Sequence, residues 1–565
     1  MSHDHDHHHH DDDAGHAHGI EGTWADPEVT DRLSVSRRGF LATAAVAAGA
    51  AAGLGATAGG LGEGVASAAY GQTVNPWTRN TRFLAGDHHV HTQFSPDAQY
   101  EVETQVSKAV EHGLDWVVIT DHGGTAHQKF SIDQVTPRVE ASRRAHDGML
   151  VYQGLEWNIP GGEHATVMLP PGYASVDILK AFEAGFDGSV LADLGKVPSA
   201  ISGAGESYAV EALKYLDAQV RNRRTELALM FANHPSRRGL DSPHEMRAWR
   251  EAAPSVAVGM EGAPGHQAAG IPLTAGGPGK ARGYYDFAPT PDSFPGYAPT
   301  ATENFYRTYG GFDFATAKVG GLWDSLLAEG KPWWVTSTSD SHQVFRDTRV
   351  PGTQNYNATG SRGTPTDTGT AITSYGDFWP GQYSATLAAS GARTYVGVMR
   401  ALQAGKVVAV HGRLIEGLDV RVRAPHDGDR QGATLGGRTW VRRGNDIEVF
   451  VTVTLPTRPN ASGQIPRLAK MDLISGPVTG PVTDRDTLTA PRTSVVETYE
   501  IPRTGSTVSF THTFRNVQES FYVRFRGSDG KQLDSAGNPP QDVVGDADPW
   551  ADLWFYANPV FVEVS

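Results

Sequence analysis

Cysteine is absent from all 565 residues of the chain. Its absence excludes a disulfide scaffold, a cysteine zinc site, an iron–sulfur cluster and a thiol nucleophile. Positive charge is also scarce, because 48 Lys and Arg residues stand against 63 Asp and Glu residues and leave a net charge of -15. This balance argues against a broadly basic surface for nucleic acid or an anionic membrane. Any metal site must therefore be built from His, Asp and Glu.

The composition, 39% hydrophobic and 20% charged residues, is typical of a globular protein. The length is enough for two to four domains. Of its 23 histidines, eight lie in the first 18 residues, in a segment too polar to form a core. The mixed His and Asp side chains of this tail could hold Zn, Ni or Cu loosely, and they are equally compatible with a soluble leader or a tag. We assign no site to them.

A basic and then apolar segment follows the tail. Residues 36–41 read Ser-Arg-Arg-Gly-Phe-Leu, residues 40–62 carry no charge, and Ala66-Ser67-Ala68 offers small residues for cleavage. This order resembles a twin-arginine export signal. The alternative is a membrane anchor, but the run is mostly Ala and Gly and lacks the bulky apolar side chains of a membrane span. We expect the twin-arginine machinery to export the chain and residues 1–68 to be removed, leaving a secreted or cell-envelope protein without a permanent membrane span.

Apolar runs alternate with amphipathic stretches from residue 81 to about 410, which predicts an α/β fold around a largely parallel sheet. The predicted strands are 83–91, 116–122, 149–156, 164–169, 227–234, 256–261 and 333–339. The predicted helices are 100–112, 133–146, 207–224, 243–252, 315–329 and 394–404. Two stretches interrupt the alternation, 263–311 and 345–391, and loops this long are usually functional. After Gly412 an alternation of period two predicts an antiparallel β-sandwich, so we expect domains at 69–412 and 413–565.

Ligand-type side chains gather at the ends of the predicted strands. His89 and His91 are two residues apart and therefore project from the same face of the first strand. The other strand ends carry Asp121 and His122, Glu156, Asn233 and His234, Glu261, and Asp340 with His342, while His164 begins the fourth strand. In a βα barrel the carboxyl ends of the strands form the active site. Burying so many of these groups together is costly unless a polynuclear metal centre lies between them.

Six ordered segments make the pattern specific: residues 87–92, 95–98, 119–122, 154–156, 233–235 and 339–342. Together they resemble the motifs of the PHP (polymerase and histidinol phosphatase) family of metal-dependent phosphoesterases. The resemblance implies a distorted (β/α)7 barrel over about residues 81–412, followed here by the β-sandwich. It also implies two or three divalent ions, which would be Mn, Fe or Zn. Imidazole and carboxylate donors without thiolate agree with those metals.

The resemblance also implies a role for each ligand. His89, His91, Glu156 and Asp340 would hold one ion, and Glu156 would bridge to a second ion held by His164 and His234. Asp97, His122 and His342 would hold a third. Neighbouring ions would lower the pKa of a shared water, orient the resulting hydroxide toward phosphorus and neutralise the transition-state oxygens. We place Glu261 in the site but not among the ligands.

Other side chains of the motifs leave more than one interpretation open. We place Asp121 in the catalytic site, where it either orients His122 or protonates the leaving group, the orienting role being favoured. Arg237 is assigned to phosphate binding, with Arg238 as its neighbour, although both could be surface arginines. For the isolated His266 and His411 we favour a structural role. Trp550, Trp554, Phe555 and Tyr556 suit a sugar-stacking platform, but such aromatics are more often sandwich core.

These observations predict an exported metal-dependent hydrolase that acts on a small phosphorylated substrate, either a phosphate monoester or a diester. One alternative keeps the metals and changes the bond to an amide or a non-phosphate ester. Another makes the chain a secreted glycan-binding protein on a PHP scaffold, which the intact ligand set argues against.

Overall fold

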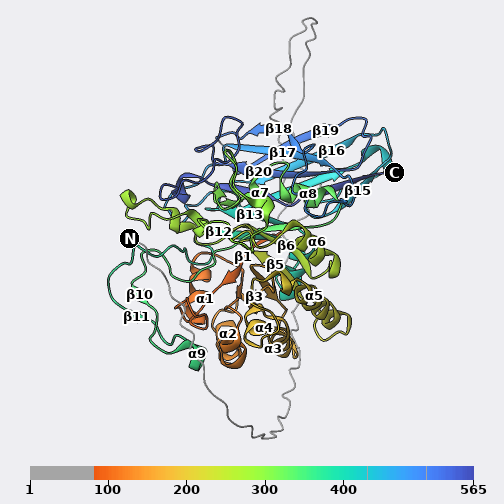
Figure 1. The fold of residues 1–565 in the computed structure, drawn as a ribbon. Helices are drawn as coiled ribbons and strands as arrows, with labels where there is room; N and C mark the ends of the chain where they lie inside the picture. The colour runs from red at the N-terminus through yellow and green to blue at the C-terminus, as the bar shows by residue number, and fades with distance from the viewer. Residues whose placement is uncertain (1–81, 429–430, 504) are drawn as a thin grey trace, which may run out of the picture. The chain divides into compact units, whose positions relative to one another are not determined.

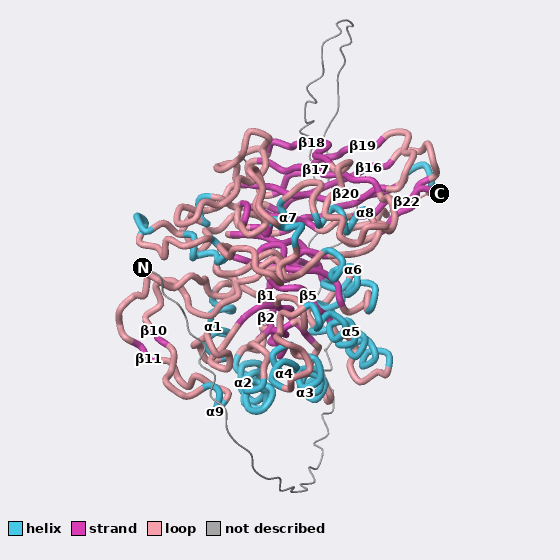
Figure 2. Tube along the Cα trace, viewed as in Figure 1, coloured by secondary structure: helices cyan, strands magenta, loops and turns pink. Residues whose placement is uncertain are grey.

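The computed structural model describes residues 82–428, 431–503 and 505–565. The tail and export signal predicted within residues 1–68 lie outside this part of the chain. Helices and strands alternate in its first two thirds, and strands dominate the remainder (Figures 1 and 2). The predicted α/β class with parallel strands is confirmed. In the described residues, no helix combines the length and the apolar character needed to cross a membrane.

The α/β region, residues 82–412, is built around a run of seven neighbouring strands in one sheet. These strands are β1 (Arg82–Val90), β2 (Trp116–Ile119), β3 (Leu150–Asn158), β4 (His164–Met168), β5 (Leu229–Asn233), β6 (Ala257–Ala263) and β9 (Trp334–Ser337). Each corresponds to a predicted strand. Neighbours pair in parallel, except that β4 runs antiparallel to both β3 and β5. Their side chains are almost wholly buried, as expected for strands covered on both faces.

The run of strands curves until its last member returns to its first. Val90 at the end of β1 forms a parallel bridge with Ser341, just after β9. The Asp340 N–H donates to the His89 carbonyl at 3.0 Å, and the His91 N–H donates to the Ser341 carbonyl at 3.2 Å. The carboxyl ends of β1 and β9 therefore lie side by side, which brings their ligand-type side chains together.

Helices cover the outside of these strands, and α1, α2 and α3 lie side by side along β2 and β3 (Figure 1). The helices of the region are α1 (Val102–Glu111), α2 (Ile132–Ala145), α3 (Ser175–Phe186), α4 (Gly188–Asp193), α5 (Glu206–Arg221), α6 (Pro243–Ala252), α7 (Phe314–Ala317), α8 (Leu322–Ala328), α9 (Tyr356–Thr359) and α10 (Tyr395–Gln403). The residues at the start of α6 explain why the helix begins there. Ser242 and Glu245 form a capping box, and Pro243 occupies the first turn.

Three predictions about elements need correction. The helix predicted at 315–329 is divided into α7 and α8, because Gly320 takes a positive φ of 75° between them. The helices α3 and α4 were not predicted. The insertion 345–391 is not all loop, since it contains the short strands β10 (Arg349–Val350) and β11 (Thr366–Asp367) and ends in β12 (Ser384–Ser390), which pairs with β1.

The sheet continues from β12 into the C-terminal region, residues 413–565. β12 pairs with β13 (Val407–His411), which pairs with β21 (Trp554–Ala557). Beyond β21 the sheet comprises β20 (Phe521–Ser528), β22 (Val560–Val564), β15 (Arg438–Val441), β17 (Lys470–Pro477) and β18 (Ser494–Glu500). A second sheet contains β14 (Gly417–Arg423), β16 (Ile447–Thr454) and β19 (Thr507–Phe514). Buried side chains of both sheets share one core cluster.

Candidate metal centre

A cavity of about 300 Å³ opens where the strands of the α/β region end. It is lined by Asp97, His122, Glu156, His164, His234, Arg237, His266, Tyr284, Asp340, His342, Gln343 and Asp377. The reversed direction of β4 explains how its first residue reaches the same place. His164 pairs in register with Asn158 at the end of β3 and with Asn233 at the end of β5.

Four buried side chains from three strand ends form the first donor group. His89 Nε2 lies 2.9 Å from Glu156 Oε1 and 3.1 Å from Asp340 Oδ1. His91 Nε2 lies 3.2 Å from Glu156 Oε2 and 3.2 Å from Asp340 Oδ1. The two imidazoles, His89 and His91, also face each other, with their Nε2 atoms 2.9 Å apart. The structure therefore brings together the predicted ligands of the first ion.

Glu156 connects this group to the predicted ligands of the second ion. Its Oε1 lies 3.1 Å from His164 Nδ1 and 3.3 Å from His234 Nε2. Its Oε2 lies 2.7 Å from His122 Nδ1. One carboxylate thus contacts imidazoles from five different positions, which is the placement that a bridging ligand needs.

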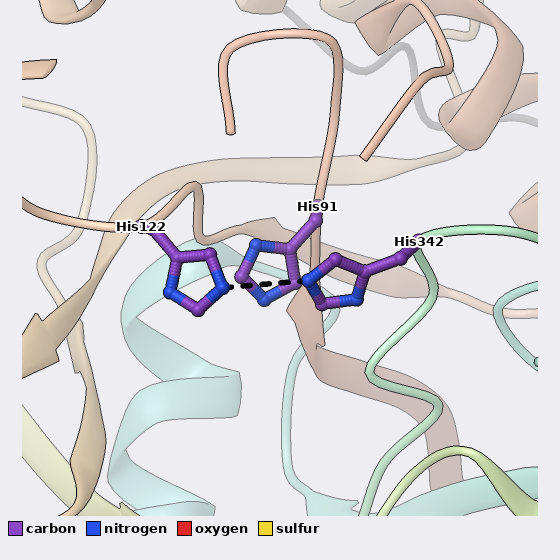
Figure 3. A group of neighbouring side chains, drawn as sticks. All are labelled: His91, His122 and His342. Atoms are coloured by element: carbon purple, nitrogen blue, oxygen red, sulfur yellow. Dashed lines mark hydrogen bonds between the residues drawn. The ribbon is translucent and has the colours of Figure 1, made fainter. Parts of the chain in front are cut away.

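The predicted third group lies at the outer side of the cavity. Asp97 Oδ2 is 3.3 Å from His122 Nε2, and Asp97 Oδ1 is 3.4 Å from His342 Nε2. The rings of His91, His122 and His342 point toward one another, and the dashed line joins the Nε2 atoms of His122 and His342 at 3.4 Å (Figure 3). All three predicted donor groups therefore meet at one cavity.

A second layer of hydrogen bonds orients the imidazoles. His89 Nδ1 lies 2.6 Å from Glu261 Oε1, while Glu261 Oε2 accepts the His234 N–H at 2.7 Å. His91 Nδ1 lies 2.9 Å from the Ser95 hydroxyl, which donates to Asp121 Oδ1 at 2.9 Å. These contacts leave the Nε2 atoms of both histidines directed inward, as the outer partners of metal-binding histidines usually do.

The histidines of the cavity lower the pKa values of its buried carboxylates. Burial alone raises the pKa of Glu156, but the imidazoles of His89, His164 and His122 outweigh burial and hold that pKa well below its usual value. Asp340 behaves in the same way, its pKa held low by His266, His89 and His342 against the effect of burial. Both carboxylates are therefore ionised at neutral pH and available as ligands.

The donors fit a bound cation. Glu156 Oε2 and Asp340 Oδ1 are buried, and among the described residues the imidazoles close to them form no hydrogen bond of good geometry with either oxygen. Buried carboxylate oxygens are costly without a hydrogen bond or a cation. The inward Nε2 atoms of His89 and His91 face the same space. Imidazole and carboxylate donors without thiolate suit Mn, Fe or Zn.

Four residues of the cavity lining were not assigned to it from the sequence: His266, Tyr284, Gln343 and Asp377. His266 lines the cavity with its Nε2 2.8 Å from Asp340 Oδ2, and its Nδ1 lies 2.6 Å from Asp377 Oδ1. His266 follows the end of β6 by three residues, so the rule that located the other ligands points to it as well. Asp377 carries no such signal, because the 345–391 insertion brings it in from a distance.

The predicted phosphate-binding arginines are placed differently from each other. Arg237 lines the cavity and lies 3.8 Å from Glu163 Oε1, and Arg238 lies at the same distance from Glu163 but outside the lining. The Arg238 guanidinium packs over the ring of Phe287, 5.7 Å from its centroid. Glu163 was not predicted, although it directly precedes His164 and is buried beside it.

Other candidates lie away from the cavity lining. Asp121 is buried, and its carboxylate accepts from the Thr92 N–H at 2.7 Å and from Ser95, so it contacts neither the cavity nor the ring of His122 among the described contacts. His411 packs between the rings of Phe312 and Tyr383, and burial lowers its pKa well below the usual value. The aromatic run at 554–556 is fully buried, as core residues are.

Comparison with known protein families gives a match for the segment that contains the first ligands of this site. Residues 87–196 match the family model for the PHP domain. The resemblance to that family is thereby confirmed over this segment. It contains six of the predicted ligands, namely His89, His91, Asp97, His122, Glu156 and His164. The other three, His234, Asp340 and His342, lie beyond the matched residues.

One solved structure also aligns with the chain. It comes from Bacteroides vulgatus ATCC 8482 and is described as a two-domain protein containing a predicted PHP-like metal-dependent phosphoesterase. The alignment covers 85% of this chain and 95% of the other, at 12% identity and a TM-score of 0.32. A likeness this weak carries no conclusion about this chain. No curated protein matches the sequence.

Proposed function

We propose that this chain is a metal-dependent phosphoesterase that hydrolyses phosphate mono- or diesters. The observation that supports this most is the position of Glu156, whose two oxygens lie within 3.3 Å of five imidazoles at the strand ends. A single carboxylate among so many imidazoles is the arrangement of a bridged metal centre. The PHP domain match over residues 87–196 supports the same chemistry.

In this proposal the donor groups would hold two or three divalent ions. His89, His91, Asp340 and Glu156 would hold one ion, His164 and His234 would hold a second together with Glu156, and Asp97, His122 and His342 would hold a third. When bound, such ions supply Lewis-acid polarisation of water and neutralise charge on phosphate oxygens.

The protein supplies the remaining functions. Arg237 lies in the cavity wall, and its guanidinium can grip phosphate oxygens beside the metal ligands. Glu163 Oε1 lies 3.8 Å from Arg237 Nε, so its negative charge compensates the buried charge of this guanidinium. Glu261 fixes the ring of His89 through its Nδ1. Gln343 and Tyr284 complete the wall and offer neutral hydrogen-bonding groups to a substrate.

The proposal includes the architecture. We infer that the curved run of strands from β1 to β9 is a distorted (β/α)7 barrel of the PHP type, and that residues 413–565 form a β-sandwich attached to it. The return of the chain after β9 to bridge β1 supports the barrel. The core cluster shared by two sheets supports the sandwich.

Removal of metal tests the proposed function. We expect protein treated with a chelator to lose hydrolysis of p-nitrophenyl phosphate and bis(p-nitrophenyl) phosphate, and to regain it with Mn²⁺, Fe²⁺ or Zn²⁺. Elemental analysis should then find two or three ions per chain. Inorganic phosphate should inhibit competitively, which an amidase would not show. Full activity after thorough chelation would contradict the proposal.

The location of the protein is a separate proposal. We propose export by the twin-arginine route, supported by the Arg37-Arg38 pair and the uncharged run that follows it. Replacing both arginines by lysine should leave the chain inside the cell with residues 1–68 attached. If the wild type and the double lysine variant gave equal amounts of processed protein outside the cytoplasm, the proposed export route would be wrong.

A further inference from the structure

The two long insertions of the α/β region meet beside Asp340. The insertion at 263–311 contributes His266, and the insertion at 345–391 contributes Asp377. The ring of His266 lies between two carboxylates, with Nε2 2.8 Å from Asp340 Oδ2 and Nδ1 2.6 Å from Asp377 Oδ1. Asp340, His266 and Asp377 therefore form a continuous chain of contacts in the wall of the cavity.

Asp377 is held firmly at the far end of this chain. Its Oδ2 accepts the N–H groups of His342 and Gln343, each at 2.7 Å. It is buried, so water does not compete for these contacts. The Asp377 carboxylate is therefore a fixed point against which the ring of His266 can be oriented.

Asp340 is the side chain that needs such an orientation. Its Oδ1 points toward the Nε2 atoms of His89 and His91, and its Oδ2 points toward His266. Its backbone has a φ of 46°, in the left-handed region that few non-glycine residues adopt. Without a partner for Oδ2, the carboxylate would lose one of the contacts that fix its rotation about the Cβ–Cγ bond, and Oδ1 could turn away from its ligating position.

The backbone around His266 is anchored on both sides. The His266 N–H donates to the Ser339 carbonyl at 3.2 Å, next to Asp340 itself. The following residue, Gln267, accepts a hydrogen bond from Arg282 Nε at 2.6 Å, and Arg282 pairs with Asp542 of the C-terminal region at 3.4 Å. The insertion is thus tied to the segment that follows β9 and to the loop of the C-terminal region that contains Asp542.

We propose that His266 and Asp377 are positioning residues that hold Asp340 in its ligating orientation. This inference deepens the proposed function, because it rests on Asp340 being a metal ligand. Outer partners of metal ligands commonly change metal affinity by about 10- to 100-fold when they are removed. His266 contacts Asp340 Oδ2, whereas His89 and His91 contact Oδ1, so it touches the ligand through the oxygen that these two imidazoles leave free.

Titration of metal-free protein with Mn²⁺ alone, by calorimetry, tests the inference. We expect His266→Ala to weaken the tightest Mn²⁺ site by about tenfold or more, or to abolish it. His266→Gln should recover much of that loss, because its amide nitrogen can occupy the place of Nε2 and donate to Asp340. Asp377→Asn should weaken the same site less than His266→Ala does.

A matched control is available outside the cavity. His244 Nδ1 lies 2.6 Å from Asp486 Oδ1, so His244→Ala removes a His–Asp pair of equal length with no metal ligand attached. It should leave Mn²⁺ binding unchanged. Far-UV circular dichroism checks that each variant is folded, and if His266→Ala fails this check, the Asp377→Asn variant decides the outcome.

The possible results separate the inference from the proposed function. Unchanged Mn²⁺ affinity in folded His266→Ala overturns the positioning role alone. If His266→Ala does not fold, unchanged affinity in Asp377→Asn overturns it. Wild-type protein that binds Mn²⁺ but hydrolyses no phosphate ester overturns the proposed function and leaves the positioning role intact. Wild-type protein that binds none of Mn²⁺, Fe²⁺ and Zn²⁺ overturns both.

Discussion

In the metal-free protein, the stability of the fold depends on whether the ring of His266 is protonated. Burial lowers the pKa of His266, but Asp340 and Asp377 outweigh burial and raise that pKa to about 10. The ordinary value for histidine is 6.5. A pKa that is higher in the folded than in the unfolded chain means that the protonated ring stabilises the fold. This contribution is fully present below pH 6.5 and is lost as the pH rises through about 10.

The pH dependence of a variant should report this coupling. For metal-free protein, we expect the free energy of unfolding of His266→Gln to be lower than that of the wild type at pH 6.5, because glutamine cannot take up a proton. The difference should shrink as the pH rises toward 10. Urea unfolding at several pH values measures it. A difference that stays constant with pH would show that the ring is not protonated in the folded chain.

At the residue scale, the predicted ligands share a property that a sequence reveals. His89, Glu156 and Asp340 each lie at or near the end of an apolar run, so strand topology alone brings them to one place. Glu163 and Asp377 have no such marker. They reach the site through the reversed strand β4 and through a long insertion, and neither path is determined by local residue patterns.

At the scale of elements, the positions of strands were predictable but their directions were not. The sequence predicts a strand that starts at His164, yet its antiparallel pairing with β3 and β5 depends on long-range contacts. The strand β12 was missed because its residues, Ser-Ala-Thr-Leu-Ala-Ala-Ser, are mostly small and only weakly apolar. The ends of helices were clearer in the sequence. Gly113, Gly330 and Gly405 each directly follow a predicted helix, and all three have the positive φ of a left-handed helix end.

The first insertion packs closely against the residues that follow β9, and this contact can be tested by a substitution. A Cβ on Gly265 would lie 2.1 Å from Asp340 Cβ and 2.2 Å from the Ser339 carbonyl oxygen, so the two segments would have to separate. We expect Gly265→Ala to destabilise the fold by about 1–3 kcal/mol and to weaken Mn²⁺ binding through displacement of Asp340. Thermal unfolding and calorimetry measure the two effects.

The control for this substitution lies in α3. A Cβ on Gly185 would meet no atom within 4 Å, so Gly185→Ala should be neutral or stabilise the helix by up to about 1 kcal/mol, and it should not change Mn²⁺ binding. Equal behaviour of the two variants would mean that the contact between Gly265 and Asp340 does not constrain the site.

At the scale of the whole described chain, the α/β region and the C-terminal strands share their interior. The sheet runs without interruption through β1, β12, β13 and β21. One hydrophobic cluster contains side chains of both, including Trp323 of α8 and Tyr522 of β20. The sequence shows a change of hydrophobic period after Gly412. It does not reveal the common core, because pairing between distant strands leaves no local pattern in the sequence.

A buried ion pair joins the two regions and allows their coupling to be tested. Asp324 of α8 accepts two hydrogen bonds from Arg524 of β20, at 2.8 and 2.7 Å, and one from the Tyr522 hydroxyl at 2.9 Å. Both charged side chains are fully buried. We expect Asp324→Ala to destabilise the protein by about 3–5 kcal/mol, because it leaves the Arg524 charge buried without its partner.

The effect of this substitution should extend to both regions at once. If their common core makes them one cooperative unit, hydrogen exchange in β5 and in β17 should speed up together in Asp324→Ala, and denaturant unfolding should remain a single transition. Asp133→Ala is the matched control, since Asp133 pairs with Lys180 at the surface, where an ion pair contributes at most about 1 kcal/mol. Faster exchange confined to β17 would show that the C-terminal strands unfold on their own and do not support the α/β region.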